Sequence, residues 1–401
     1  MKRHETLKLS AFFSLYIAQS IPMSFLSTVI PVLMRQQEFS LTAIGLLQLI
    51  KVPWLIKFLW SPFVDRNTNS LGSYKKWIIG SELCYAIIIF LVSLLDLQID
   101  IILIAILIIA SFVASATQDI ATDALAARSV NKENKSLVNS MQSMGSFAGT
   151  MVGSGVLLLL YKKFGWNMIL PALSGFVLIA LIPLVFLKKS DLPQEEKRTK
   201  ASGWDFIHFF TRRKIWNQIG FLFLAYSGII GILSMLRPLM VDLGFTIQEI
   251  GFMSGVFGTS AGFCCSYLGG RIIKKIGRYK SRILFAALVA VAAAYFFIIS
   301  KGEMTALQLY IGIALVWGGY GMSTVGVYTT SMDRVREGRE GTDFTIQTVI
   351  THLSSMIIAI CSGKLAQSYG YNNLFCIELI LAVLTMIYAF FAFRNKQHED
   401  E

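Results

Sequence analysis

Long apolar stretches recur along this chain about a dozen times, and they constrain its fold more than any other feature of the sequence. Hydrophobic residues make up 55% of the 401 residues, and charged residues make up only 15%. A bilayer core about 30 Å thick needs about 20 apolar residues for each helix that crosses it. Helices satisfy their backbone hydrogen bonds segment by segment in lipid. The sequence therefore predicts an all-α polytopic membrane protein.

Twelve membrane-spanning helices in two six-helix halves are predicted. The predicted spans are residues 9–34, 41–62, 76–95, 100–126, 136–161, 168–187, 214–241, 246–270, 281–300, 304–332, 342–366 and 373–393. The first stretch is too long for a cleaved signal peptide, so we expect it to remain as a helix. The segment 188–213 is charged and separates six spans from six. The predicted domains are therefore 1–187 and 214–401, joined by a cytoplasmic linker at 188–213. Its aromatic end, residues 204–210, predicts a short helix at the membrane surface.

The distribution of positive charge predicts the orientation in the membrane. Of the 36 Lys and Arg residues, 28 lie in the termini and in every second loop, or at the helix ends that border them. The opposite loops hold four, and four more lie inside spans. Cytoplasmic loops carry such an excess of Lys and Arg. Both termini are therefore expected in the cytoplasm.

The remaining composition excludes several classes of function. The net charge of +12 is placed in loops that face lipid headgroups, so we expect contact with membrane lipid and no nucleic-acid binding. All five cysteines fall in apolar spans without the spacing of metal ligands, and the four histidines form no cluster. No nucleotide-binding or hydrolase signature is present. We expect no enzymatic activity, no cofactor and no metal, and a monomer.

The two halves carry a weak internal repeat. Residues 39–45 read FSLTAIG, and residues 245–251 read FTIQEIG, at an offset of 206 residues. Many secondary transporters are built from duplicated halves, with the substrate site near the membrane midplane where the halves meet. The repeat therefore favours a transporter.

The loop between the second and third spans resembles the signature of the major facilitator superfamily, G-x-x-x-D-R-x-G-R-R. Asp65 and Arg66 match that signature, whereas Ser61 stands where the family has glycine. In the second half, Lys274 stands where the family has an acid. The resemblance implies the major facilitator fold, in which two halves expose a substrate to each side of the membrane in turn.

A narrower resemblance is to the AmpG-like permeases. Residues 57–66 read KFLWSPFVDR, which is similar to the family motif K-F-L-W-[SA]-P-x-x-D-R. Residues 115–124 read SATQDIATDA, which is similar to [SA]-x-Q-D-I-x-x-D-[AG] in the fourth helix. The family includes muropeptide permeases, siderophore importers of the RhtX and FptX type, and eukaryotic acetyl-CoA transporters. The resemblance implies proton-driven import. Within the family, the short length of the chain favours the siderophore importers.

Two carboxylates inside the fourth span are the first candidates for coupling. Asp119 and Asp123 are four residues apart, so both lie on one face of a helix. Neighbouring carboxylates in a cleft disfavour double ionisation, and one can then carry a proton. The alternative is a cytoplasmic gate, in which the pair binds nearby cations. The predicted coupling or gate residues are Asp65, Arg66, Lys57, Asp119, Asp123 and Arg128.

Cations and polar side chains inside the other spans are candidates for the substrate site. Lys51 lies in mid-span, where either an anionic substrate or a buried acid such as Glu82 would account for it. Arg237 would hold a carboxylate or phosphate with its planar fork, or would simply lie at the interface. The predicted substrate-binding residues are Lys51, Arg237, Tyr16, Gln19, Gln118, Tyr226, Trp317, Tyr320, Gln347 and His352.

The sequence thus predicts a secondary active transporter whose partners are a small-molecule substrate and a proton. The cargo is expected to be a medium-sized polar or anionic solute, with a siderophore or a muropeptide named first. A drug or metabolite exporter on the same fold, and a membrane sensor that transports nothing, remain as alternatives. Direction of transport and solute flux distinguish the three.

Overall fold

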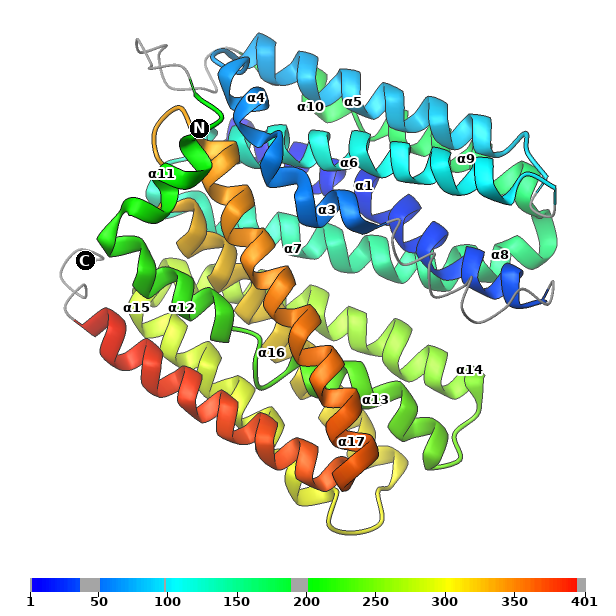
Figure 1. Ribbon diagram of the computed structural model, residues 1–401, viewed down its shortest axis with the longest axis vertical. Helices are drawn as coiled ribbons and strands as arrows, with labels where there is room; N and C mark the ends of the chain where they lie inside the picture. The colour runs from blue at the N-terminus through cyan, green and yellow to red at the C-terminus, as the bar shows by residue number, and fades with distance from the viewer. Residues whose placement is uncertain (1, 37–50, 97–98, 189–200, 395–401) are drawn as a thin grey trace. The chain divides into compact units, whose positions relative to one another are not determined.

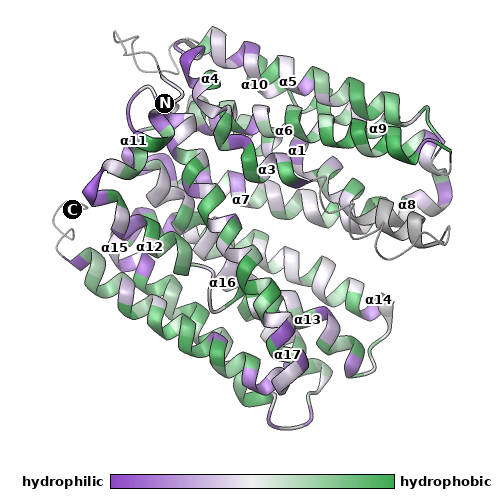
Figure 2. Ribbon diagram, viewed as in Figure 1, coloured by the Kyte–Doolittle hydropathy of each residue, from purple (hydrophilic) through white to green (hydrophobic). Residues whose placement is uncertain are grey.

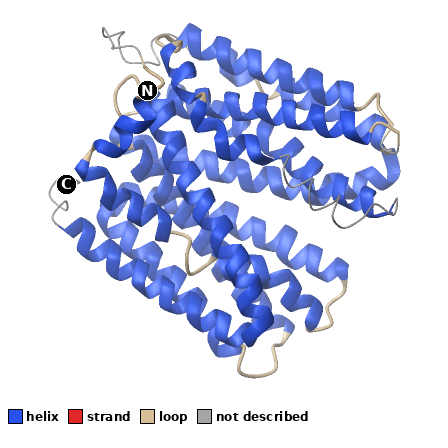
Figure 3. Cartoon of the chain, viewed as in Figure 1, coloured by secondary structure: helices blue, strands red, loops and turns tan. Residues whose placement is uncertain are grey.

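The computed structural model describes residues 2–36, 51–96, 99–188 and 201–394 (Figure 1). Within these ranges the regular structure is entirely helical, and no strand occurs (Figure 3). The prediction of an all-α chain is confirmed. The first copy of the predicted repeat, at 39–45, and residues 189–200 of the charged linker lie outside the described residues.

The helices follow the chain in this order: α1 (Lys2–Gln36), α3 (Val52–Ile56), η2 (Lys57–Leu59), α4 (Ser61–Arg66), α5 (Leu71–Val92), α6 (Ile101–Ser129), η3 (Lys132–Asn134), α7 (Lys135–Met151), η4 (Val152–Val156), α8 (Leu157–Phe164), α9 (Trp166–Ile179), α10 (Ile182–Val185), α11 (Asp205–Thr211), η6 (Arg213–Ile215), α12 (Trp216–Leu224), α13 (Ile230–Asp242), α14 (Ile247–Ile250), η7 (Gly251–Gly258), α15 (Thr259–Ile299), α16 (Ala306–Met332) and α17 (Glu340–Phe393). The elements η4 and η7 are π-helical, and the other η elements are short 3₁₀ turns.

The chain forms two compact units. Unit 1 comprises Met1–Asn131, Ala148–His208 and Val335–Val349. Unit 2 comprises Lys132–Phe147, Phe209–Arg334 and Ile350–Glu401. Helices α7 and α17 therefore each contribute residues to both units. The domain boundaries at 187 and 214 stay a prediction.

Six helical segments of the described chain are long and apolar enough to cross a membrane. Two of them, Gln248–Ile299 and Glu340–Phe393, are 52 and 54 residues long. At 1.5 Å per residue, a straight helix of that length would be about 80 Å long, far more than a bilayer core. Gly277 and Gly370, both with a φ of 81°, interrupt these segments within the predicted loops. Each segment therefore holds two spans.

Three predicted spans are broken rather than continuous, and one of them, 168–187, is divided into α9 and α10. The described part of 41–62 consists of α3, η2 and α4, and Pro53 and Pro62 stand at the starts of α3 and α4. Proline has no backbone N–H and is best accommodated in the first turn of a helix, which is where Pro53 and Pro62 stand. The span predicted at 214–241 is likewise divided into α12 and α13, with residues 225–229 between them.

Helix α6 changes character along its length. In its first half Ile102 and Ile106 are 76% and 57% exposed, as expected for side chains that face lipid. In its second half all but one of the residues from Ala116 to Arg128 are buried. Helix α5 packs along α6, and apolar residues predominate along α5 and α9 (Figure 2). Polar residues that α6 carries in its second half are thus held inside unit 1.

Candidate functional site

The two carboxylates of α6 have separate partners within unit 1. Gln19 of α1 donates to Asp119 Oδ1 at 2.9 Å. Tyr16, one turn earlier on α1, donates to Asp123 Oδ1 at 2.5 Å. The spacing of three on α1 and of four on α6 places the two donors opposite the two acceptors. Lys57 joins these four residues through Asp119, and we call the five residues predicted from sequence, Tyr16, Gln19, Lys57, Asp119 and Asp123, the carboxylate cluster.

Lys57 completes the carboxylate cluster. Its ammonium forms an ion pair with Asp119 Oδ2 and lies 4.8 Å from the centre of the Trp54 ring. The side chain is 1% exposed, so it does not reach out of the protein. The ammonium of Lys57 therefore pairs with a carboxylate inside the protein and does not snorkel to the membrane surface. A buried ion pair with one further donor satisfies Asp119 without a water molecule.

Asp65 of α4 holds the start of α17. Its two carboxyl oxygens accept the backbone N–H groups of Gly341 at 2.9 Å and of Thr342 at 2.6 Å. The first N–H groups of a helix lack partners within the helix, and a negative charge there is favourable. Burial raises the pKa of Asp65 to about 7, although these N–H donors oppose the shift. Asp65 is therefore poised between its charged and neutral forms near neutral pH.

A second charged cluster lies beside Asp65 in unit 1. Arg336 donates two nitrogens to Asp343, at 2.7 and 2.9 Å, and a third to Asp205 of α11 at 3.3 Å. Arg339 pairs with Asp205 at 3.2 Å. Partial burial acts to raise the pKa of Asp205. The N–H of Ser202 and these two arginines outweigh that effect and lower the pKa of Asp205 below its ordinary value. The linker helix α11 is thus tied to the same segment of α17 that Asp65 binds.

The other proposed cations of the gate lie away from the carboxylate cluster. Arg66 is exposed. Arg128 is buried, donates to the carbonyl of Asn69 at 3.0 Å and lies 5.9 Å from the centre of the Tyr74 ring. The pairing of these arginines with the α6 carboxylates is absent from the described structure, because Arg128 instead ties the end of α6 to the loop before α5.

Lys51 and Glu82 do not form the ion pair considered from sequence. Lys51 is half-buried next to α3, and no hydrogen bond or ion pair joins it to Glu82 in the described part of the chain. Glu82 is fully buried in α5, and neither of its carboxyl oxygens has a hydrogen-bond partner among the described residues. An anionic substrate remains the open explanation for Lys51.

Three of the predicted substrate residues meet in unit 2. The rings of Tyr226 and Tyr320 are 5.2 Å apart, and those of Trp317 and Tyr320 are 6.3 Å apart. Phe147, which sequence reasoning missed, contacts Trp317 and Tyr320 edge-on at 5.9 Å each. We call these four residues the aromatic cluster. Such rings beside polar groups suit a bulky organic ligand.

Polar atoms accompany the aromatic cluster. The Tyr226 hydroxyl donates to Thr324 at 3.3 Å, which fixes the ring. The indole N–H of Trp317 is buried and has no hydrogen-bond partner in the described structure. A buried donor without a partner is costly unless a ligand or water satisfies it. The Trp317 N–H is therefore the donor of this cluster that is available to a bound molecule.

The remaining predicted substrate residues are scattered. Arg237 is exposed on α13, and its Nε lies 3.4 Å from Ser254 Oγ. Gln347 is buried on α17 and donates to the carbonyl of Asp343 in its own helix. His352 is half-buried further along α17. Gln118 is fully buried on α6, and its amide has no hydrogen-bond partner among the described residues. Their role in binding stays a prediction.

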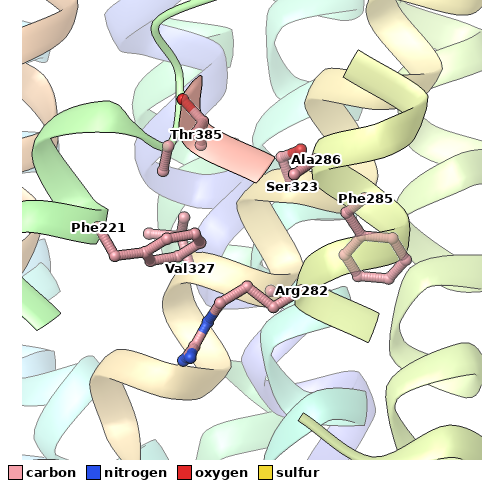
Figure 4. A pocket seen from close by; sticks show the side chains of 9 residues that line it. Phe221, Arg282, Phe285, Ala286, Ser323, Val327 and Thr385 are labelled. Atoms are coloured by element: carbon pink, nitrogen blue, oxygen red, sulfur yellow. The ribbon is translucent and has the colours of Figure 1, made fainter. Parts of the chain in front are cut away.

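A small cavity in unit 2 lies apart from all of these residues (Figure 4). Its lining includes Phe221, Arg282, Ser323 and Thr385. It has room for no more than a few water molecules, and the Arg282 guanidinium lies over the rings of Phe221 and Phe393. We assign no cargo to it.

Sequence reasoning also missed Glu378, a buried acid in the first part of the last predicted span. Its signal was present, because an ionisable side chain inside a span is costly and usually has a function.

Comparison with known protein families finds a match over most of the chain. The model of the Major Facilitator Superfamily matches residues 11–359. An uncharacterized protein of Haemophilus influenzae is 25% identical over 400 residues, which cover 95% of this chain and 93% of that protein. The anhydromuropeptide permease of Escherichia coli K12 is 21% identical over 378 residues, which cover 92% of this chain and 76% of the permease. The Rickettsia prowazekii protein AmpG 3 is 23% identical, and the match covers 98% of each chain.

Solved structures share the fold. A bacterial homologue of the iron transporter ferroportin, in an outward-facing state, has a TM-score of 0.72 at 17% identity, with 96% of this chain and 98% of that chain covered. The Escherichia coli fucose:proton symporter FucP has a TM-score of 0.73 at 14% identity and the same coverage. At these identities the likeness concerns the fold alone.

Proposed function

Because this chain belongs to the Major Facilitator Superfamily, we propose that it is a proton-coupled importer of a medium-sized polar or anionic organic solute, with a muropeptide as the first cargo to test. It is an integral membrane protein with the major facilitator fold. Proteins of this kind move solutes without chemical change, which agrees with the expectation that it is not an enzyme. Residence in a bacterial inner membrane, with both termini in the cytoplasm, is part of the proposal.

The carboxylate cluster is the observation that carries the coupling proposal. Asp119 is balanced by the Lys57 ammonium, whereas Asp123 Oδ1 accepts a hydrogen bond from the neutral hydroxyl of Tyr16. Two carboxyl groups and one ammonium leave a site that can take one proton without an excess of buried charge. Proton transfer at Asp123 would then change the charge of the cluster. We assign proton coupling to Asp123 and charge balance to Lys57.

Asp65 supports a separate role as a gate. Its carboxylate binds the first turn of α17, and the loss of that contact would free the segment that also holds α11. We propose that Asp65 governs the rate at which the cytoplasmic end of the protein opens. This role coexists with coupling at Asp123, because the two sites have no residue in common.

The relatives favour a muropeptide over a siderophore as cargo. The Escherichia coli relative is an anhydromuropeptide permease, and the match to it covers most of both chains. Its identity of 21% leaves the cargo of this chain open. The aromatic cluster suits a solute with a bulky face, a description that includes both candidates.

Uptake into proteoliposomes tests the proposal. Labelled anhydromuropeptide and labelled ferric siderophore are offered with and without an inward proton gradient. We expect the gradient to drive uptake of one of them, and we expect Asp123→Asn to abolish the gradient-driven part. Glu303→Gln is the matched control, because Glu303 is an exposed carboxyl in a loop.

Two results would contradict the proposal. Uptake that is equally fast in Asp123→Asn would remove Asp123 from coupling. The absence of uptake for both cargoes, in protein shown to be folded, would exclude both of them. Efflux in the reverse orientation would then favour the exporter, and no flux at all would favour the sensor.

A further inference from the structure

A break interrupts the helix that carries Tyr226. Helix α12 ends at Leu224 and α13 begins at Ile230, with Tyr226 and Gly228 between them. Gly228 has a φ of 122°, a backbone angle that residues other than glycine rarely adopt. Such a break leaves the last carbonyl groups of one helix and the first N–H groups of the next without intrahelical partners. In a membrane each unsatisfied group costs several kcal/mol.

One face of α17 supplies the missing partners. Thr385 donates its hydroxyl to the carbonyl of Leu224 at 3.0 Å. Glu378 accepts the N–H of Gly228 at 3.2 Å. Ala382 lies between them, and a Cβ added at Gly228 would come within 2.5 Å of its Cβ. The spacings of four and three residues place all three side chains on one face of α17. This face of α17 therefore supplies a hydrogen-bond partner at each end of the break.

The Glu378 carboxyl is enclosed on every side that the described structure shows. It is 1% exposed, and its second oxygen accepts the Ser362 hydroxyl at 3.2 Å. A methyl group at Gly231, in the first turn of α13, would overlap both the carboxyl and that hydroxyl. A carboxylate at the start of a helix is also favoured by the helix dipole. Every group that faces Glu378 is thus small or a donor.

The break fixes a residue of the aromatic cluster. Tyr226 is 3% exposed, and its carbonyl accepts the N–H groups of Ile229 and Ile230, so its position depends on the fold of the break. Its ring and hydroxyl then reach Tyr320 and Thr324 of α16. A change in the backbone at Gly228 would therefore move Tyr226 against the aromatic cluster.

We propose that Glu378 is a positioning residue for cargo binding, which acts by holding the N–H of Gly228 and so setting Tyr226 within the aromatic cluster. This inference rests on the proposed function, because it assigns cargo to that cluster. Glu378 is not required to exchange a proton. An amide at this position, which can still accept the Gly228 N–H, should preserve much of the effect.

The first test is independent of transport. Hydrogen exchange of the amides in residues 225–231 is compared among the full-length wild type, Glu378→Ala, Glu378→Gln and Ser362→Ala. We expect exchange to be about tenfold faster in Glu378→Ala, and close to wild type in Ser362→Ala, which leaves the Gly228 contact in place. Unchanged exchange in Glu378→Ala would overturn the proposal.

The second test uses the kinetics of uptake. We expect Glu378→Ala to raise KM about tenfold with little change in kcat, and Tyr226→Leu to do the same. If Glu378 acts through Tyr226, the variant with both Glu378→Ala and Tyr226→Leu should raise KM about tenfold and not about a hundredfold. Additive effects would overturn the proposal.

The glutamine variant separates positioning from proton transfer. Glu378→Gln should keep the pH profile of the wild type, with a KM nearer to wild type than that of Glu378→Ala. If Glu378→Gln instead loses all gradient-driven uptake, Glu378 carries a proton and the positioning role is wrong. If the wild type transports neither cargo while exchange still rises in Glu378→Ala, the proposed function fails and the hold on the break stands.

Discussion

At the scale of single residues, the ion pair between Lys57 and Asp119 is the contact with the greatest consequence for stability. Both side chains are almost completely buried, and Gln19 is the other donor to Asp119. Loss of one partner from a buried pair leaves a charge in the interior, whereas replacement of both partners can be nearly neutral. The pair is therefore better judged by a double substitution than by either single one.

Lys57→Met should destabilise the protein by about 3–5 kcal/mol, because Asp119 keeps a buried charge with one donor. Lys57→Met combined with Asp119→Asn should recover most of that loss. Thermal unfolding in detergent measures both, with Lys275→Met, an exposed lysine, as the control. A double variant that is no more stable than Lys57→Met would show that the charge of Asp119 is not the cause.

At the scale of helices, the sequence predicted where helices occur better than it predicted where they are interrupted. The spacing of Asp119 and Asp123 fixed their common face on α6 because that relation is local. Pro53 and Pro62 are a local signal for breaks in 41–62. The apolar residues around them nevertheless favoured the prediction of one continuous span. The break at Gly228 was not predictable from its own segment, since the groups that stabilise it, Glu378 and Thr385, lie about 150 residues further along the chain.

Asp65 predicts a pH dependence of stability. Its pKa in the folded protein is about 7, above the ordinary value of 3.8. Between those two values the folded protein keeps a proton that the unfolded chain releases, so this group lowers the free energy of unfolding as pH rises from about 4 to about 7. Asp65→Asn should remove that slope. The Tm of wild type minus that of Asp65→Asn should therefore fall between pH 5 and pH 7.5, and a flat or rising difference would contradict the shifted pKa.

The glycines that separate the paired spans of α15 and α17 should be needed for their backbone angle alone. Gly277 and Gly370 both have a φ of 81°, and nothing lies within 4 Å of a Cβ added at either one. Substitution by alanine should cost about 1–2 kcal/mol at each. Gly175→Ala is the matched control, because Gly175 is helical and equally open, and it should stabilise by about 0.5–1 kcal/mol. Equal Tm changes at Gly370 and Gly175 would refute the argument.

At the scale of the whole molecule, the fold was predictable because it follows from composition and charge placement. Apolar runs of span length and the match of residues 57–66 to a family motif required no tertiary information. The aromatic cluster was predicted in part, since Tyr226, Trp317 and Tyr320 are among the substrate-binding residues expected from sequence. Phe147 was missed because an isolated phenylalanine in an apolar run carries no signal of its partners. The two arginines proposed for the gate do not pair with the carboxylate cluster in the described structure, where Arg66 is exposed and Arg128 binds the carbonyl of Asn69.

The orientation in the membrane gives a prediction for the whole chain. In a background without native cysteines, Glu303→Cys should react in intact cells with a maleimide that cannot cross the membrane, whereas Glu133→Cys should react only after the cells are opened. Both glutamates are exposed, so access to solvent does not distinguish them. The reverse pattern would invert the orientation derived from the positive charges.

The two-part character of α6 has a consequence for biosynthesis. An aspartate at the centre of a span raises the cost of insertion by about 2.5–3.5 kcal/mol, and α6 carries two. Its isoleucine-rich first half enters the bilayer readily, with a mean hydropathy of 2.4 in the most apolar window of the helix. Lys57 precedes Asp119 by 62 residues, so it has already left the ribosome when Asp119 arrives. The order of synthesis thus delivers the cation first, and the nascent chain can neutralise the carboxylate as soon as that carboxylate leaves water.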